Sequence, residues 1–312
     1  MEQHYKIFTW PVYPQYLQEL AQGDFEIYIP EGQNQTLRQQ FINCKNIIEV
    51  SADAVKNLPL NCIIFQDEHS YLARQHTLFS DQQREIAKVY VEHQPPKQHP
   101  TNAKHVVDDL LVRLVHVNHY NALMWDNNQT PVTVIENGVK ETDASFTGKK
   151  PCGVVVFDEN STYSRVTGLD IFEQIKEALP LEVMRIGQDN VTYQNLPEKL
   201  SSYRFLFCPD RYASPGFPVK QAMMIGIPVV GLATTNLPTI ISNEVSGFVH
   251  SDLQYLIQKM QQLIENLPLA VQLGANARLD ALKNFTTNRF LADWTQVIDE
   301  AVAQNQSLLT KI

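Results

Sequence analysis

The feature that most constrains this fold is an alternation that runs along the whole chain. Short runs rich in Val and Ile alternate with longer segments whose apolar residues recur with helical spacing. Such alternation is typical of a parallel β-sheet wrapped by helices, because strands that are buried on both faces carry apolar residues on both. The pattern therefore predicts an α/β fold.

The alternation falls into two blocks. In the first block the predicted strands are YKIFTW, FEIYIP, NIIEV, NCIIFQ, AKVYVEH, RLVHVN and VTVIENGV. In the second block they are CGVVVFD, LEVMRIG, RFLFCPD, IPVVGL and GFVH. The predicted helices include YPQYLQELA, TLRQQFINC, SDQQREIA, GLDIFEQIKEAL, LPEKLSSY and LQYLIQKMQQLIENL, and a last helical stretch from Arg278 onward.

A polar segment, KETDASFTGKK, separates the two blocks. The chain has 312 residues, which is too long for one ordinary core and predicts two domains of about 150 residues each. We therefore expect an N-terminal Rossmann-like domain at 1–139, a linker at 140–150 and a C-terminal Rossmann-like domain at 151–312. Two doubly wound domains of this kind face each other across a cleft, and ligands bind at the carboxyl ends of their strands.

Composition limits the classes of function. Hydrophobic residues make up 44% of the chain and charged residues 19%, and the formal net charge is −9. This composition is globular, and its acidity argues against nucleic acid as a partner. No apolar run is long enough to span a membrane, and the start MEQHYKIFTW does not resemble a signal peptide, so the sequence predicts a cytoplasmic protein.

Cysteine and histidine spacings do not predict a metal site. The cysteines are scattered without a CxxC pair, as is typical of reduced thiols. Three histidines recur six residues apart, which brings ligands together on neither a helix nor a strand. We expect no metal and no bound cofactor. The residues concerned are Cys44, Cys62, Cys152, Cys208, His93, His99 and His105.

The stretch SPGFPVKQAMMIGIPVVGLATTNLPTII, Ser214–Ile241, is the most informative segment. After a Pro-Gly turn we expect a helix that begins near Phe217 and ends at Gly226 and Pro228. The first N–H groups of a helix have no partner within it, so they form a site for an anion such as phosphate. Gly216 lets a ligand approach the backbone closely.

This stretch resembles the donor-binding half of the retaining GT-B glycosyltransferases of the family 4 type. The matching segments are GFPVKQAMMIGIPVVGLATTNLPTII and EVSGFV, supported by VTVIENGV, YSRVTGLDIF, RIGQDN and LGANARLDALKNFTTNRFLADW. The resemblance is weaker over the first half, where KVYVEHQPP and VHVNHYN are the matching pieces. The combination of segments is more specific than any one of them.

The resemblance implies the GT-B fold and a metal-independent hexosyltransferase. Such an enzyme transfers a sugar from a nucleotide-sugar donor to a glycan or lipid-linked acceptor with retention of configuration. It implies a role in surface polysaccharide or lipopolysaccharide biosynthesis, and it leaves open contact with the inner face of a membrane. The last helix of this fold often crosses back to the N-terminal domain, and Trp294 is the natural anchor for that helix.

The same resemblance assigns roles to individual residues. Arg165 stabilises the leaving diphosphate as a two-pronged cation, and His93 matches a histidine at a strand end that touches the donor sugar. The residues expected to bind the nucleotide donor are Ser214, Gly216, Phe217, Gln221, Arg211 and Thr167.

Three positions depart from the family pattern. Two family glutamates, eight positions apart, are replaced by Ala213 and Gln221, and a family lysine before Gly168 is replaced by Thr167. The amide oxygen of Gln221 can still accept a hydrogen bond from a ribose hydroxyl, although without the added strength of a charged acceptor.

These departures keep two alternatives open. One is a catalytically impaired protein of the same fold that acts as a binding or scaffold partner. The other is a different GT-B reaction, such as nucleotide-sugar epimerisation, which needs several acidic and histidine residues that the sequence does not supply. Retention of Arg165, His93 and the turn before the helix favours the transferase.

Overall fold

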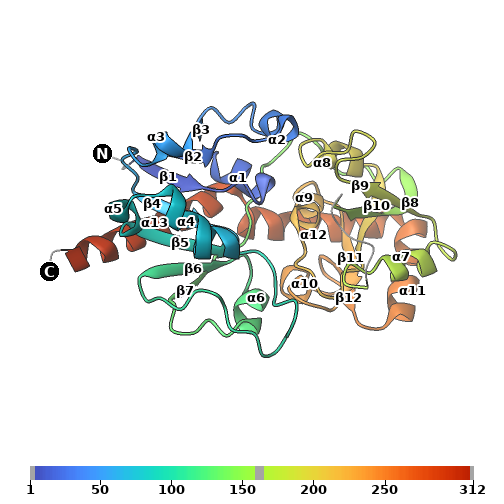
Figure 1. Cartoon of the computed structure of the whole chain (residues 1–312). Helices are drawn as coiled ribbons and strands as arrows, with labels where there is room; N and C mark the ends of the chain where they lie inside the picture. The colour runs from blue at the N-terminus through green and yellow to red at the C-terminus, as the bar shows by residue number, and fades with distance from the viewer. Residues whose placement is uncertain (1–3, 159–164, 310–312) are drawn as a thin grey trace. The chain divides into compact units, whose positions relative to one another are not determined.

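The computed structural model describes residues 4–158 and 165–309, and its elements are labelled in Figure 1. Contacts between residues divide the chain into two units. The first unit comprises Met1–Gly138 and Thr287–Ile312, and the second comprises Val139–Thr286. Each unit has a parallel sheet of its own.

The first unit contains a seven-stranded parallel sheet in the order β3-β2-β1-β4-β5-β6-β7. Its central strands are almost completely buried, as their Val and Ile content predicts. All seven strands that the sequence predicts in the first block are present. They are β1 Tyr5–Thr9, β2 Phe25–Pro30, β3 Ile47–Val50, β4 Cys62–Phe65, β5 Ala87–Glu92, β6 Val112–His116 and β7 Val132–Val134.

Short helices connect these strands, and a long final helix packs on the sheet. The short ones are α1 Pro14–Leu20, α2 Gln35–Gln40, α3 Ala52–Val55, the π-helix η1 Ser70–Arg74, α4 Gln75–Leu78, α5 Asp81–Arg84 and α6 His119–Met124. The last helix of the chain, α13 Thr287–Leu309, contacts β4, β5 and β6.

Trp294 anchors α13 in the core of the first unit. The side chain is fully buried, its Nε1 donates a 2.9 Å hydrogen bond to the hydroxyl of Tyr16, and Phe290 packs edge-on beside both rings. A buried tryptophan whose N–H has found a partner combines a large apolar contact with a fixed orientation. In Figure 1 this helix, in red, runs beside the blue and green strands of its own unit.

The second unit contains a five-stranded parallel sheet in the order β12-β11-β10-β8-β9. All five strands that the sequence predicts in the second block are present. They are β8 Lys150–Phe157, β9 Leu181–Arg185, β10 Tyr203–Cys208, β11 Val229–Leu232 and β12 Gly247–His250. The first of them begins at Lys150, the last residue of the segment in which the sequence predicts a linker.

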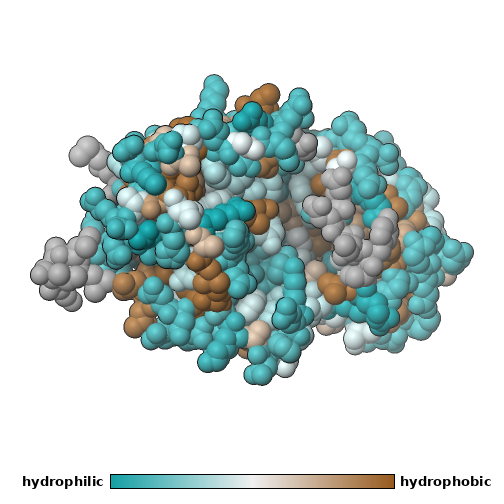
Figure 2. Space-filling model, in the orientation of Figure 1, coloured by the Kyte–Doolittle hydropathy of each residue, from teal (hydrophilic) through white to brown (hydrophobic). Residues whose placement is uncertain are grey.

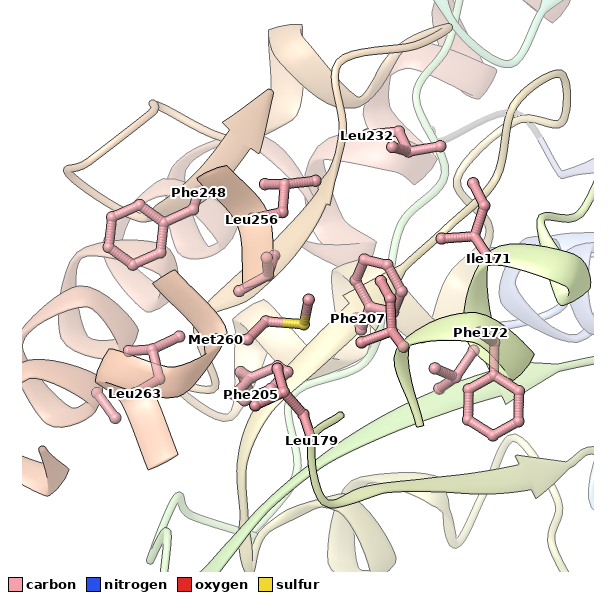
Figure 3. Packing of buried hydrophobic residues seen from close by; sticks show 14 of the residues in the cluster. Ile171, Phe172, Leu179, Phe205, Phe207, Leu232, Phe248, Leu256, Met260 and Leu263 are labelled. Atoms are coloured by element: carbon pink, nitrogen blue, oxygen red, sulfur yellow. The ribbon is translucent and has the colours of Figure 1, made fainter. Parts of the chain in front are cut away.

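Helices cover both faces of this second sheet. They are α7 Leu169–Ile175, α8 Leu196–Leu200, α9 Phe217–Met224, α10 Leu237–Ile240, α11 Leu253–Glu265 and α12 Leu267–Asn284. Figure 3 shows the core on one face, where Phe205 and Phe207 of β10 lie between Met260 of α11 and Phe172 of α7. This packing fixes β10, the strand that leads into the segment Ser214–Ile241.

The helix α9 begins and ends where the sequence predicts. It starts at Phe217. At its other end, Gly226 adopts φ +86°, Gly226 N donates to the Met223 carbonyl and Ile227 N donates to the Ala222 carbonyl. This pair of bonds is a Schellman motif, which requires a left-handed residue and therefore favours glycine.

One helix prediction is wrong in its boundary. The sequence predicts one helical stretch from Arg278 onward, whereas α12 ends at Asn284 and α13 begins at Thr287. Phe285 is buried between them and adopts a non-helical conformation, and its carbonyl accepts a hydrogen bond from Val139 N. Burial of this aromatic ring and the bond to Val139 interrupt the helix where the side-chain pattern alone does not.

On the face drawn in Figure 2, hydrophilic residues predominate and hydrophobic ones lie in small groups. Among the described residues, no helix combines the length and the apolar character needed to cross a bilayer.

Candidate functional site

The order of strands in the second sheet locates a ligand site. The first strand of the unit, β8, lies between β9 and β10, so the chain builds the sheet outward in one direction from β8 and then in the other from β10. In open parallel sheets, ligands bind at the carboxyl ends of the strands beside such a reversal. The segments that follow β8 and β10 therefore form the candidate ligand site.

These two segments are held together by backbone contacts. The N–H groups of Arg211 and Tyr212 both donate to the carbonyl of Val166, at 2.8 and 3.2 Å. Gly168 has φ +71°, and a Cβ at this position would lie 1.9 Å from the carbonyl oxygen of Pro209. Glycine is therefore required at 168 by both its conformation and its neighbour. The preceding Tyr163 and Ser164 of the motif YSRVTGLDIF lie outside the described residues.

Two arginines converge on Asp170 at the start of α7. Arg211 donates to both carboxylate oxygens, at 2.6 and 2.8 Å, and Arg165 donates to one of them at 3.2 Å. Arg211 also donates to the carbonyl of Arg165 at 2.8 Å. Arg211, followed by Arg165, holds the pKa of Asp170 below its ordinary value.

The two arginines differ in how far they remain available to a ligand. The side chain of Arg165 is 79% exposed and that of Arg211 is 28% exposed. Bidentate pairing commits Arg211 to Asp170, so its geometry favours a role in supporting the Arg165 segment. Arg165 keeps most of its guanidinium in solvent.

The N-terminus of α9 lies at the same end of the sheet. Gly216 is the residue before the helix, and it has no side chain with which to cap the first N–H groups. Gly216 has φ −80° and a Cβ there would meet only Pro218 Cδ, at 3.4 Å. Neither conformation nor internal packing therefore demands glycine at 216. Pro218 in the first turn removes one N–H donor.

A small cavity opens against this helix start. Its volume is about 40 Å³, which accommodates a water molecule or a single small group but not a whole nucleotide. It is lined by Val156, Leu206, Phe207, Cys208, Pro209, Asp210, Gly216, Pro218 and Val219.

Asp210 is a site residue that the sequence reasoning missed. Its carboxylate lies 3.2 Å from the thiol of Cys208, and its carbonyl accepts a 2.6 Å hydrogen bond from the Thr234 hydroxyl. Burial raises the pKa of Asp210 to about 7, an effect that the Cys208 thiol partly offsets. An acidic side chain two residues after a buried strand was the available signal for this residue.

Gln221 presents an unpaired acceptor. Its Nε2 donates a 2.7 Å hydrogen bond to the carbonyl of Tyr193, whereas its Oε1 is buried without a partner. The ring of Tyr193 packs against Phe217, and its hydroxyl donates to Asp158. Buried polar atoms in proteins are rarely left unpaired. A hydrogen-bond donor on a ligand at this position would offset the free-energy cost of burying Oε1 without a partner.

The structure thus groups seven of the eight predicted site residues in the second unit. Arg165, Thr167, Arg211, Ser214, Gly216, Phe217 and Gln221 belong to the segments that follow β8 and β10, or to α9 itself. Thr167 and Ser214 are both half-buried.

His93, the eighth, follows β5 in the first unit. It is 6% exposed, stacks on Tyr13 with ring centroids 3.7 Å apart, and approaches Gln66. Burial lowers the pKa of His93 to about 3, so the imidazole is uncharged at neutral pH. Across the described residues, no three His, Cys, Asp or Glu side chains group as a metal site requires.

Comparison with known proteins identifies the fold. No family model matches the chain, and no curated protein is significantly similar to it in sequence. The HepE protein of Anabaena, solved in complex with UDP and glucose, is similar with a TM-score of 0.71 at 12% identity, over 95% of this chain and 100% of HepE. Sucrose-phosphate synthase of Thermosynechococcus elongatus gives a TM-score of 0.71 at 12% identity, over 96% and 99% of the two chains.

A glycosyltransferase from Rickettsia africae gives a TM-score of 0.69 at 12% identity, over 96% of this chain and 99% of that one. Similarity over almost the full length of each protein shows that the chain has the GT-B fold, which confirms the predicted fold class.

Proposed function

We propose that this chain is a metal-independent glycosyltransferase that transfers a hexose from a nucleotide-sugar donor to a glycan or lipid-linked acceptor, with retention of configuration. The proposed setting is surface polysaccharide or lipopolysaccharide biosynthesis. The observation that carries the proposal is the buried, unpaired Oε1 of Gln221 on α9, the helix whose N-terminus lies at the strand-order reversal.

The diphosphate of the donor is assigned to the start of α9 and to Arg165. A helix N-terminus attracts negative charge through its N–H groups and its dipole. Arg165 adds a guanidinium that is largely exposed, and such a group binds phosphate oxygens in two-pronged fashion. Gly216 leaves the backbone uncovered on its outer side, since only Pro218 stands near the position of a Cβ.

The ribose is assigned to Gln221. Because Nε2 of the amide is already bonded to the Tyr193 carbonyl, the group that faces a ligand is the acceptor Oε1. An acceptor next to an anion site selects a ligand with both a diphosphate and a hydroxyl group, and a nucleoside diphosphate has both. Solved structures of this fold contain UDP, UDP-glucose, or UDP with a sugar, so uridine nucleotides are the first to test.

The proposed reaction needs no nucleophile from the protein. The bond between the anomeric carbon and the diphosphate oxygen breaks, and a bond from that carbon to the acceptor oxygen forms on the same face. The acceptor hydroxyl proton passes to the departing diphosphate. The protein stabilises the charge on that leaving group, which is the kind of preorganised electrostatic assistance that gives the largest effects in catalysis.

A first experiment measures melting temperature with UDP, GDP, ADP, CMP and dTDP, each at millimolar excess. A ligand at about 100 times its dissociation constant, bound only to the folded state, adds about 2.7 kcal/mol of stability. Release of nucleoside diphosphate from the matching sugar nucleotide then tests turnover. Binding without any release would favour the scaffold alternative, which the replacements at Ala213, Gln221 and Thr167 support. A failure of all five nucleotides to bind would reject a donor site altogether.

Gln221→Leu tests the assigned acceptor, with Gln258→Leu on the exposed side of α11 as the matched control. Loss of one hydrogen bond is worth about 1 kcal/mol, so we expect UDP affinity to fall about five- to tenfold in Gln221→Leu alone. Equal affinities of the two variants would remove Gln221 from the site.

A further inference from the structure

Residues 209–216 of the second unit connect β10 to α9 and lead into the start of that helix. On one side their backbone is held by the segment after β8, because the N–H groups of Arg211 and Tyr212 both donate to the Val166 carbonyl. On the other side, two of their carbonyl groups are held by the loop that follows β11. The position of the helix start therefore depends on both neighbouring segments.

Two consecutive threonines of the loop after β11 make these contacts. The Thr234 hydroxyl donates to the Asp210 carbonyl at 2.6 Å, and the Thr235 hydroxyl donates to the Ala213 carbonyl at 3.1 Å. We refer to Thr234 and Thr235 together as the clasp. Both threonines are half-buried, and hydrogen bonds are stronger where they are shielded from water. The clasp therefore restrains the backbone that precedes α9.

Thr235 adopts a backbone conformation that its own side chain disfavours. Its φ is +48°, which lies in the left-handed region, where β-branched residues are rare because of steric strain. Glycine would adopt this φ without the strain, but it has no hydroxyl to donate to Ala213. Strained residues cluster at ligand sites, where the strain is part of the mechanism.

The strands and the helix around the loop impose this conformation. Ala233 N donates to the His250 carbonyl of β12. Leu237 of α10 packs so closely on β11 that a Cβ at Gly231 would lie 2.3 Å from Leu237 Cδ2. Because both ends of the loop are fixed, Thr235 cannot relax by a movement of the loop. Strain of this kind persists only where the surrounding structure determines the conformation.

We propose that Thr235 is a positioning residue whose strained backbone directs its hydroxyl to the Ala213 carbonyl, so that the clasp holds residues 209–216 in the form that presents the start of α9 to the diphosphate. This inference rests on the proposed function, because it takes the diphosphate to bind at that helix start. Loss of the Thr235 hydroxyl should therefore weaken UDP binding without removal of any group assigned to the ligand.

Calorimetric titration of UDP into two variants tests the hydroxyl. Thr235→Val keeps the β-branched shape and removes the hydroxyl, so we expect UDP affinity to fall about fivefold, the equivalent of one hydrogen bond. Thr235→Ser keeps the hydroxyl, and its affinity should stay within about twofold of the wild-type value. Unchanged affinity in the valine variant, or an equal loss in the serine variant, would overturn the proposal.

Thr235→Gly separates the strain from the hydrogen bond. Glycine loses the hydroxyl and relieves the strain, so this variant should bind UDP as weakly as Thr235→Val and yet melt at the same temperature or higher. At an unstrained position the glycine variant would melt lower, because glycine gains more freedom in the unfolded chain. That lower melting temperature would overturn the role of strain. Thr235→Gly also replaces Thr235→Val in the binding test if the valine variant does not fold.

Hydrogen exchange tests the clasp without a ligand. The two N–H groups of residues 209–216 that donate to Val166 exchange when this backbone opens locally, so their exchange should become at least about fivefold faster in Thr235→Val. Thr147→Val is the matched control, because the Thr147 hydroxyl donates to the Ser201 carbonyl before β10, at the other end of the same sheet. Unchanged exchange in Thr235→Val, or an equal rise in Thr147→Val, would overturn the clasp.

These measurements distinguish failure of the inference from failure of the proposed function. If the wild type binds UDP and exchange becomes faster in Thr235→Val while affinity is unchanged, the clasp is structural only and the positioning role is overturned. If the wild type does not bind UDP, the proposed donor site and the positioning role are both rejected, and the exchange rates alone decide whether the clasp holds residues 209–216.

Discussion

Replacement of Asp210 by asparagine is predicted to change how stability depends on pH. Burial raises the pKa of this carboxyl to about 7, whereas the pKa of an aspartate in an unfolded chain is about 3.9. The difference is about 3 pKa units, and each unit corresponds to about 1.4 kcal/mol, so ionisation of Asp210 costs the native state up to about 4 kcal/mol.

The direction in which stability changes with pH follows from proton binding by Asp210. Between about pH 4 and pH 7 the native state holds a proton on Asp210 that the unfolded state has lost, so rising pH removes stability through this range. The asparagine side chain of the variant cannot ionise and has no such loss. Urea unfolding of both proteins should therefore give equal free energies near pH 4. Above pH 7 the Asp210→Asn protein should be more stable by up to about 4 kcal/mol.

Asp170→Asn provides a control of opposite sign. Arg211 and Arg165 lower the pKa of Asp170, so its carboxylate contributes stability above the unfolded pKa and loses it as pH falls through the folded value. Because this group is 42% exposed, the variant should lose no more than about 1 kcal/mol at neutral pH. A stability difference for Asp210→Asn that does not vary with pH would refute the burial argument.

Three further predictions concern other residues of the fold and the site. Arg165→Ala should change the free energy of unfolding by no more than about 1 kcal/mol, because the side chain is 79% exposed. It should lower UDP affinity at least tenfold in a calorimetric titration, since hydrogen bonds to charged groups are worth about 1.5–3 kcal/mol. Unchanged affinity would exclude Arg165 from the donor site. Gly168→Ala should destabilise the chain by at least about 1–3 kcal/mol in urea unfolding, because φ is +71° and the Cβ would clash with Pro209; a neutral effect would refute the close approach. Trp294→Ala should cost about 3–5 kcal/mol in urea unfolding, against at most about 0.5 kcal/mol for Leu279→Ala at an exposed position; similar costs for both would contradict the packing of α13.

The strands could be predicted from the sequence because each is a short Val- and Ile-rich run bounded by polar or turn residues. The order of strands could not. Whether β8 pairs with β10 depends on contacts between segments about 50 residues apart, and nothing in either segment alone encodes that choice. Short helices such as α3 and α6 were also missed, because one or two turns of helix carry too few residues to show a period.

Part of the candidate site could be predicted for the same local reason. The turn at Gly216, the helix after it and the end at Gly226 follow from the conformations that Gly and Pro allow. The partners of Arg211 and of Gln66 could not be predicted, because Asp170 and Trp10 are far from them in sequence. Asp210 shows the same limit, since its raised pKa comes from burial that only the folded chain creates.

The most direct test of the proposed donor site is a calorimetric titration of UDP into the wild-type chain and into Gly216→Ala. The structure has room for this Cβ, whose nearest neighbour is Pro218 Cδ at 3.4 Å, so the variant should lose no more than about 1 kcal/mol of stability. If the start of α9 holds the diphosphate, the wild type binds UDP at one site and the Gly216→Ala protein binds it at least tenfold more weakly. Equal affinity for both proteins would contradict a diphosphate at Gly216.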